Sequence, residues 1–184
     1  GAIDAFLAGQ AGMASQKGTD EEGNELYLGH SPRKAKIKRI IVHYTASWNS
    51  KGAIRTLMKK HLSYHFFIER DGKLLQLLDP DKYVAFHAPP RNFESIGVSF
   101  VNVGYERSGI KAKPEWVTKG GLRWQEYPMP QLQTYVSLMK KLVQKHNIPR
   151  TEIHPHSLWP PGTTKQDPGP AFPMEQTLNS IYGG

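Results

Sequence analysis

The feature that most constrains the fold is the segment 37–43, which reads IKRIIVH. Its apolar residues are Ile37, Ile40, Ile41 and Val42, all branched at the β carbon, a type that favours strands. Apolar residues at successive positions indicate a strand that is buried on both faces. We therefore predict one α/β domain, with a central mixed β-sheet flanked by helices.

The remaining elements follow from local patterns. Helical spacing of apolar residues predicts helices over 52–61, 130–147 and 173–182. Pro130 suits the first helical turn, and Asn147 suits the helix end. Short runs rich in apolar and β-branched residues predict strands over 64–69, 74–78, 83–87, 95–101 and 151–154.

Two segments do not follow these patterns. Residues 1–30 are rich in Gly, Ala, Ser and charged residues, and we expect a flexible N-terminal arm or linker with a short helix at 3–7. The domain itself is expected over 31–184. Residues 104–130 lack periodicity and contain Trp116 and Trp124, so we interpret them as an insertion with a functional role.

The composition limits the classes of partner and of metal site. The 184 residues include 24 Lys and Arg against 16 Asp and Glu, a formal charge of +8, which favours an anionic partner. There is no cysteine, so a disulfide or thiolate site is excluded and any metal is held by histidine and carboxylate. No apolar run approaches the length of a membrane span. We find no DNA- or RNA-binding motif and expect no nucleic-acid partner.

A candidate metal site lies in the stretch 154–170, HPHSLWPPGTTKQDPGP. A histidine followed by Asp167 in a proline-rich loop offers two ligands, and catalytic zinc needs three protein ligands and one open position. The third candidate is His43, at the end of the predicted strand. Spacing does not choose between His154 and His156, because residues i and i+2 of a strand share a face. Each of these residues also has an ordinary alternative: a structural histidine, or an Asp-Pro-Gly turn.

Five motifs in chain order carry a family resemblance: IIVHYT, SYHFFIERDG, AFHA, SIGVSF, and HS followed by KxDPGP. Together they resemble the type-2 family of zinc-dependent N-acetylmuramoyl-L-alanine amidases. That family includes phage amidase endolysins, bacterial recycling amidases and peptidoglycan recognition proteins. The resemblance extends from Lys36 to Phe172; residues 1–30 and 104–130 lie outside its clear part.

The resemblance implies a Zn²⁺ ion held by His43, His156 and Asp167. His156 is chosen over His154 because the family ligand stands just before a Ser or Arg, here Ser157. The resemblance also implies catalytic roles for Tyr64 and Lys165. Ser99 occupies a position where some relatives have Glu, which favours the version of the site that uses a tyrosine and a lysine.

We expect His87, Trp48 and Arg91 to contact the substrate. Tyr64 has the alternative of packing in the core, and His87 that of a buried structural histidine. Trp48, Trp116, Trp124 and Tyr127 suit either a glycan groove or the core.

The function implied is hydrolysis of the amide bond between N-acetylmuramic acid and L-alanine in peptidoglycan or muropeptides, in the manner of bacteriolytic enzymes that degrade cell walls. The alternative is a non-catalytic muropeptide-binding module of the same fold. We expect a monomer. The first residues do not form a convincing signal peptide, so we expect delivery to the wall by a phage or particle, or a cytoplasmic location, with this chain as part of a longer protein.

Overall fold

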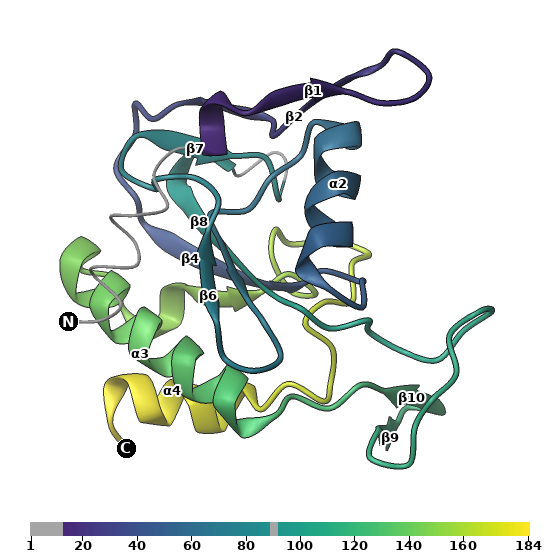
Figure 1. The fold of residues 1–184 in the computed structure, drawn as a ribbon. Helices are drawn as coiled ribbons and strands as arrows, with labels where there is room; N and C mark the ends of the chain where they lie inside the picture. Colours follow the sequence, from purple (N-terminus) through teal and green to yellow (C-terminus); the bar gives the residue numbers. More distant parts are fainter. Residues whose placement is uncertain (1–12, 89–91) are drawn as a thin grey trace.

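The computed structural model describes residues 13–88 and 92–184. Within these residues the main sheet has five strands in the order β11-β4-β8-β5-β6. Strands β11, β4, β8 and β5 run parallel to one another, and β6 pairs antiparallel with β5. The predicted mixed sheet is therefore confirmed (Figure 1).

The strands of this sheet are β4 (Arg39–Tyr44), β5 (Phe66–Ile68), β6 (Leu74–Gln76), β8 (Ser95–Phe100) and β11 (Ile153–Pro155). Three further pairs are formed by β1 (Lys17–Thr19) with β2 (Glu25–Tyr27), β3 (His30–Pro32) with β7 (Tyr83–Ala85), and β9 (Val117–Lys119) with β10 (Leu122–Trp124). The helices are α2 (Ser50–Lys60), α3 (Met129–His146) and α4 (Met174–Tyr182), and the 3₁₀ turns are η1 (Met13–Ser15), η2 (Asn92–Glu94) and η3 (Arg150–Glu152).

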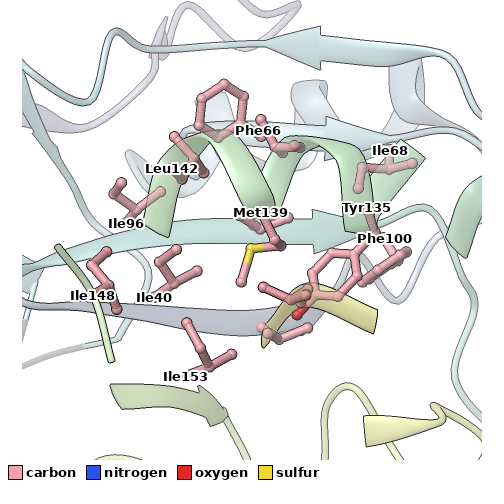
Figure 2. Close-up of a cluster of buried hydrophobic side chains, with 14 of the residues drawn as sticks. Ile40, Phe66, Ile68, Ile96, Phe100, Tyr135, Met139, Leu142, Ile148 and Ile153 are labelled. Atoms are coloured by element: carbon pink, nitrogen blue, oxygen red, sulfur yellow. The ribbon is translucent and has the colours of Figure 1, made fainter. Parts of the chain in front are cut away.

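The main core lies between one face of the sheet and helices α3 and α4 (Figure 2). Alternate residues of each strand point to this face, as a pleated strand requires: Ile40 and Val42 of β4, and Phe66 and Ile68 of β5. Tyr135 of α3 is fully buried among them. The opposite face of β5 presents Phe67 to a second cluster under α2, which contains Leu28, Ala53, Leu57, Phe67 and Leu77. The sheet is thus covered on both faces, as the apolar run at 37–43 predicted.

The helix ends follow local signals in the sequence, although α2 begins two residues before its predicted start at 52. α2 begins after Asn49, whose side chain accepts a hydrogen bond from the Gly52 amide at 2.8 Å. α3 has Pro130 in its first turn and ends at Asn147, which adopts the left-handed conformation with φ of 53°. None of the helices in the described part of the chain has the length and apolar character needed to cross a membrane.

The N-terminal segment differs from the predicted flexible arm. The expected helix at 3–7 lies outside the described residues, but from Met13 onward the chain forms η1 and the β1–β2 hairpin, which lies against α2 (Figure 1). Leu28 is fully buried, the Tyr27 ring stacks on His61 at 3.8 Å, and His61 Nε2–H donates to the Glu25 carbonyl at 3.0 Å. The domain boundary at residue 31 also falls inside β3. The polar composition of 1–30 gives no sign of these few apolar contacts, because α2, Phe67 and Leu77 provide them only in the folded protein.

The insertion at 104–130 forms the β9–β10 hairpin, which projects from one end of the molecule (Figure 1). Its base returns to the domain through Tyr127, which is buried and donates a hydrogen bond to the Pro168 carbonyl at 2.6 Å. Trp124 packs so close to Gly169 that a β carbon there would lie 2.8 Å from its ring. The insertion therefore braces the loop that carries Asp167.

Candidate metal centre

The three predicted ligands meet at the C-terminal ends of two neighbouring strands. His43 is on β4, His156 directly follows the edge strand β11, and Asp167 lies in the loop beyond it. All three are buried, and one ligand atom from each lies within 4.8 Å of the others. The site is at the edge of the sheet, as predicted.

Strand register decides which of the two nearby histidines joins the site. In the parallel pair β11–β4, His154 lies opposite Ile41 and Pro155 opposite Val42. The next residue, His156, donates its backbone amide to the Val42 carbonyl at 3.1 Å, which places it level with His43. His154 is two residues short of this level and instead stacks on Trp159, with ring centroids 4.5 Å apart.

Asp167 lies between the two imidazoles. Its Oδ2 is 2.8 Å from His43 Nδ1, and both of its oxygens are 3.0 Å from His156 Nδ1. Burial alone would raise the pKa of this carboxyl, but the hydrogen bonds to His156 and His43 outweigh it and hold the pKa well below its usual range. Burial lowers the pKa of His43 to about 4, with Asp167 opposing the change. Asp167 is therefore a carboxylate and His43 a neutral imidazole near pH 7.

This donor set fits zinc. Two neutral imidazoles and a carboxylate are ordinary ligands of a catalytic zinc ion, which leaves a fourth position for water or substrate. Bonds of about 2.0–2.2 Å in tetrahedral geometry separate neighbouring ligand atoms by about 3.3 Å. The two separations from Asp167 to the imidazole nitrogens, 2.8 and 3.0 Å, are a few tenths of an ångström shorter, so small shifts of the carboxylate would admit the ion.

A cavity of about 770 Å³ opens in front of the cluster. His156 and Asp167 form part of its wall, whereas His43 is fully buried behind them. Other residues that line the cavity include Tyr44, Tyr64, Tyr105, Arg107 and Lys165. A ligand of substantial size can therefore reach the cluster through this cavity.

Tyr64 and Lys165, the two predicted catalytic residues, both line this cavity. The Tyr64 ring lies 4.7 Å from the His43 ring, measured between centroids. Burial raises the pKa of its phenol well above the usual value, the Asp167 carboxylate adds to the rise, and Ser99 opposes it. Tyr64 therefore keeps its proton at neutral pH and can donate a hydrogen bond. Lys165 is exposed, on the loop two residues before Asp167.

The predicted substrate contacts have different outcomes. His87 lines the cavity but is only 6% exposed, and its ring is turned towards His43. Trp48 is 47% exposed and lies beside Trp116, with ring centroids 6.1 Å apart. Trp48 is not among the residues that line the cavity. Arg91 lies outside the described residues.

The sequence interpretation did not single out Tyr44, Tyr105 and Arg107 as site residues. Burial raises the pKa of Tyr44, next to the predicted ligand His43 in the chain, to about 12. Arg107 donates to the carbonyls of Val103 and Tyr105, at 2.9 and 2.6 Å, so its guanidinium is held in place. The available signal for Tyr105 and Arg107 was the aromatic and basic composition of the 104–130 insertion, and for Tyr44 its place directly after His43.

A family model described as N-acetylmuramoyl-L-alanine amidase matches residues 33–170. The chain belongs to this family. Among curated proteins, AmiD of Escherichia coli K12, an N-acetylmuramoyl-L-alanine amidase, is 28% identical over 192 residues, covering 94% of this chain and 64% of AmiD. The chain thus spans less than two thirds of that relative.

Solved structures of this amidase family share the fold. E. coli AmiD in complex with anhydro-N-acetylmuramic acid-L-Ala-D-γ-Glu-L-Lys superposes with a TM-score of 0.67 at 23% identity, covering 90% of this chain and 66% of AmiD. AmpDh3 of Pseudomonas aeruginosa, in complex with an anhydromuramic pentapeptide, gives 0.64 at 20% identity, with coverage of 89% and 66%. The endolysin amidase LysCS of Clostridium intestinale gives 0.59 at 21% identity, with coverage of 82% and 90%.

Proposed function

We propose that this domain is a zinc-dependent amidase that hydrolyses the bond between the lactyl group of N-acetylmuramic acid and L-alanine. The observation that carries the proposal is the buried cluster of His43, His156 and Asp167 at the wall of a cavity large enough for a muropeptide. Membership of the amidase family supports the same reaction.

The three clustered side chains would hold the ion through His43 Nδ1, His156 Nδ1 and an oxygen of Asp167. A zinc ion at this place supplies Lewis acidity and lowers the pKa of water from about 15.7 to about 7. The protein's part is to present a neutral His43 imidazole and an ionised Asp167 carboxylate next to His156, which the low pKa of Asp167 and the lowered pKa of His43 achieve.

Tyr64 and Lys165 supply the polar groups that face the substrate. Attack on an amide places negative charge on the carbonyl oxygen, and a donor aimed at that oxygen typically contributes about 100- to 1000-fold in rate. The phenol of Tyr64 keeps its proton and so serves as a hydrogen-bond donor, not as a base. The ammonium of Lys165, on the loop that fixes Asp167, offsets the same charge.

Ser99 explains why a carboxylate is not assigned to this mechanism. It is fully buried on β8, opposite His43 in the parallel pair β4–β8, so the two side chains lie next to each other on one face of the sheet. A hydroxyl at this position cannot act as a carboxylate base. The roles proposed for Tyr64 and Lys165 are therefore hydrogen-bond donation and charge compensation at the carbonyl oxygen.

The charge around the cavity suits a muropeptide. Among the residues that the structure describes, Lys60, Arg107 and Lys165 line the cavity together with one acidic residue, Asp167. A stem peptide such as L-Ala-D-γ-Glu-L-Lys carries free carboxylates that these cations would attract. Trp48, with its exposed ring, is proposed to stack on a sugar outside the cavity. We propose action on the cell wall, in the manner of an endolysin.

The test combines metal analysis with product analysis. Purified protein is assayed for zinc by elemental analysis, then incubated with anhydro-N-acetylmuramic acid-L-Ala-D-γ-Glu-L-Lys and, separately, with intact sacculi. We expect about one zinc per chain and release of the tripeptide, detected by mass spectrometry. The matched control is Asp167→Asn, which keeps the shape of the side chain but removes its charge and should lose both zinc and activity.

The possible results discriminate between the functions. Cleavage of sacculi in preference to the soluble fragment supports action on the wall, and the reverse result contradicts it. Binding of the fragment by zinc-loaded protein without cleavage would instead establish the non-catalytic binding module.

A further inference from the structure

The ring of His87 lies directly behind the predicted ligand His43. His87 Nδ1 is 2.8 Å from His43 Nε2, and the two rings meet edge to face with centroids 5.0 Å apart. On the far side, His87 Nε2 is 3.0 Å from Ser95 Oγ. All three residues are buried. The polar atoms therefore form a continuous chain from Asp167 through His43 and His87 to Ser95.

The sequence around β8 creates the space for this ring. Gly97 lies on the face of the sheet that carries His43, and a β carbon at this position would be 2.7 Å from His87 Cγ and 2.8 Å from its Nδ1. Such distances are far below normal contact, so a side chain at 97 would displace the ring. Ser95, two residues earlier on the same face, supplies the hydroxyl at the end of the chain. The SIGVS segment thus has the small residues that this packing needs.

The direction of the hydrogen bonds bears on metal binding. A neutral imidazole has one nitrogen with a free lone pair and one that carries a proton. If His43 binds a metal through Nδ1, which faces Asp167 and His156, its proton must be on Nε2 and needs an acceptor. His87 Nδ1 is that acceptor, and His87 then donates its own Nε2–H to Ser95 Oγ. If these hydrogen bonds ran in the opposite direction, the proton would lie on His43 Nδ1 and occupy the ligand position.

We propose that His87 is a positioning residue which, together with Ser95, holds His43 in the tautomer and orientation that leave Nδ1 free for the metal. This inference rests on the zinc site of the proposed function and adds a residue to it. His87 then acts through His43 and not by contact with substrate.

The test is a matched pair of substitutions, His87→Asn and His87→Leu. Asn and Leu have nearly the same size and both leave the space of the lost ring, but only Asn places an acceptor oxygen near the former Nδ1. Zinc affinity is measured by competition with a chromophoric chelator. Loss of an outer partner of a ligating histidine typically weakens metal binding about 10- to 100-fold. We expect this loss in His87→Leu and recovery of the greater part in His87→Asn.

Two further measurements keep the test independent of folding and of turnover. Ser95→Ala removes the last hydroxyl of the chain and should weaken zinc binding in the same direction but by less. The visible spectrum of the Co²⁺-substituted protein should change in His87→Leu and return towards wild type in His87→Asn. If His87→Leu does not fold, as judged by circular dichroism of the metal-free protein, the result for Ser95→Ala decides.

Equal zinc affinity in wild type and His87→Leu would overturn the inference. Equal weakening in both His87 variants would also overturn it, because ring packing and not the acceptor would then matter. Unchanged affinity in Ser95→Ala would contradict the role given to Ser95, and where His87→Leu does not fold it would overturn the inference as a whole. A wild-type protein that binds no zinc or cleaves no muropeptide would instead contradict the proposed function itself, so the two failures are distinguishable.

Discussion

Replacing His154 and His156 by alanine, one at a time, tests the strand register that selects the metal ligand. The two histidines are two residues apart and point to the same face, yet they have different surroundings. His156 is buried at hydrogen-bond distance from Asp167. His154 contacts Glu152 and Trp159 instead. We expect His156→Ala to lose zinc and activity together, and His154→Ala to keep both.

The structure gives the size of each effect. His154 Nε2–H donates to Glu152 at 3.0 Å, a bond worth about 0.5–1.5 kcal/mol, and its stack on Trp159 contributes about 0.5–1.5 kcal/mol. His154→Ala should therefore cost about 1–3 kcal/mol of stability, which for a chain of this length lowers Tm by about 2–12 °C. His156→Ala removes a proposed ligand itself, so zinc affinity should fall by more than the about 10- to 100-fold typical of an outer partner.

The assay measures three quantities for each variant: zinc affinity by chelator competition, cleavage of a defined muropeptide, and Tm of the metal-free protein. Comparing metal-free proteins separates loss of packing from loss of the ion. If His154→Ala lost zinc and His156→Ala kept it, the register of β11 against β4 would be wrong. If both variants kept zinc and activity, the cluster with Asp167 would not be the metal site.

Three further predictions concern individual side chains. Lys165→Ala should keep zinc but lower kcat by about 100-fold or more, and Lys165→Arg should not restore the rate because a planar guanidinium does not replace a compact ammonium. The measurement is single-turnover cleavage with the zinc content of each variant checked. A near-normal rate in Lys165→Ala would exclude Lys165 from the reaction. Tyr64→Phe should keep the fold and lower kcat by about 100- to 1000-fold, and because burial raises the pKa of Tyr64, the wild-type rate should not depend on its ionisation between pH 6 and 9. Burial lowers the pKa of His65 to about 3, against 6.5 for an exposed histidine. As the pH falls, the unfolded chain therefore takes up a proton before the folded protein does. The free energy of unfolding should decrease between about pH 6.5 and 3, by up to about 1.4 kcal/mol per pH unit. Urea unfolding of the metal-free protein should show this loss, reduced in His65→Gln, and identical pH profiles for the two proteins would contradict it.

Much of the fold could be predicted because the determining interactions are local or periodic. The β-branched run at 37–43 buries its apolar side chains only in a strand that is covered on both faces. The apolar spacing from Leu132 to Val143 gives α3 one apolar face that packs on the core. Asn147 ends that helix because its short polar side chain tolerates a positive φ. The residue types of the cluster also followed from the chain, since a protein without cysteine has only histidine and carboxylate to offer a zinc ion.

Other features depend on contacts between distant segments. The arm before residue 31 has too few apolar residues to indicate structure, yet Leu28 is buried because α2 and β5 provide its neighbours. Tyr127 and Trp124 brace the Asp167 loop across more than forty residues of sequence. No periodicity within the 104–130 insertion encodes that contact.

The sequence by itself determined the buried strand, the main helices and the kinds of side chain available as ligands. The tertiary structure decided which of these side chains meet. His154 and His156 are equivalent in spacing and in face, and only the pairing of β11 with β4 brings His156 level with His43. The same packing places His87 behind His43, over the bare backbone of Gly97. The physical reason is that register and close approach are properties of two segments together, so neither segment alone contains them.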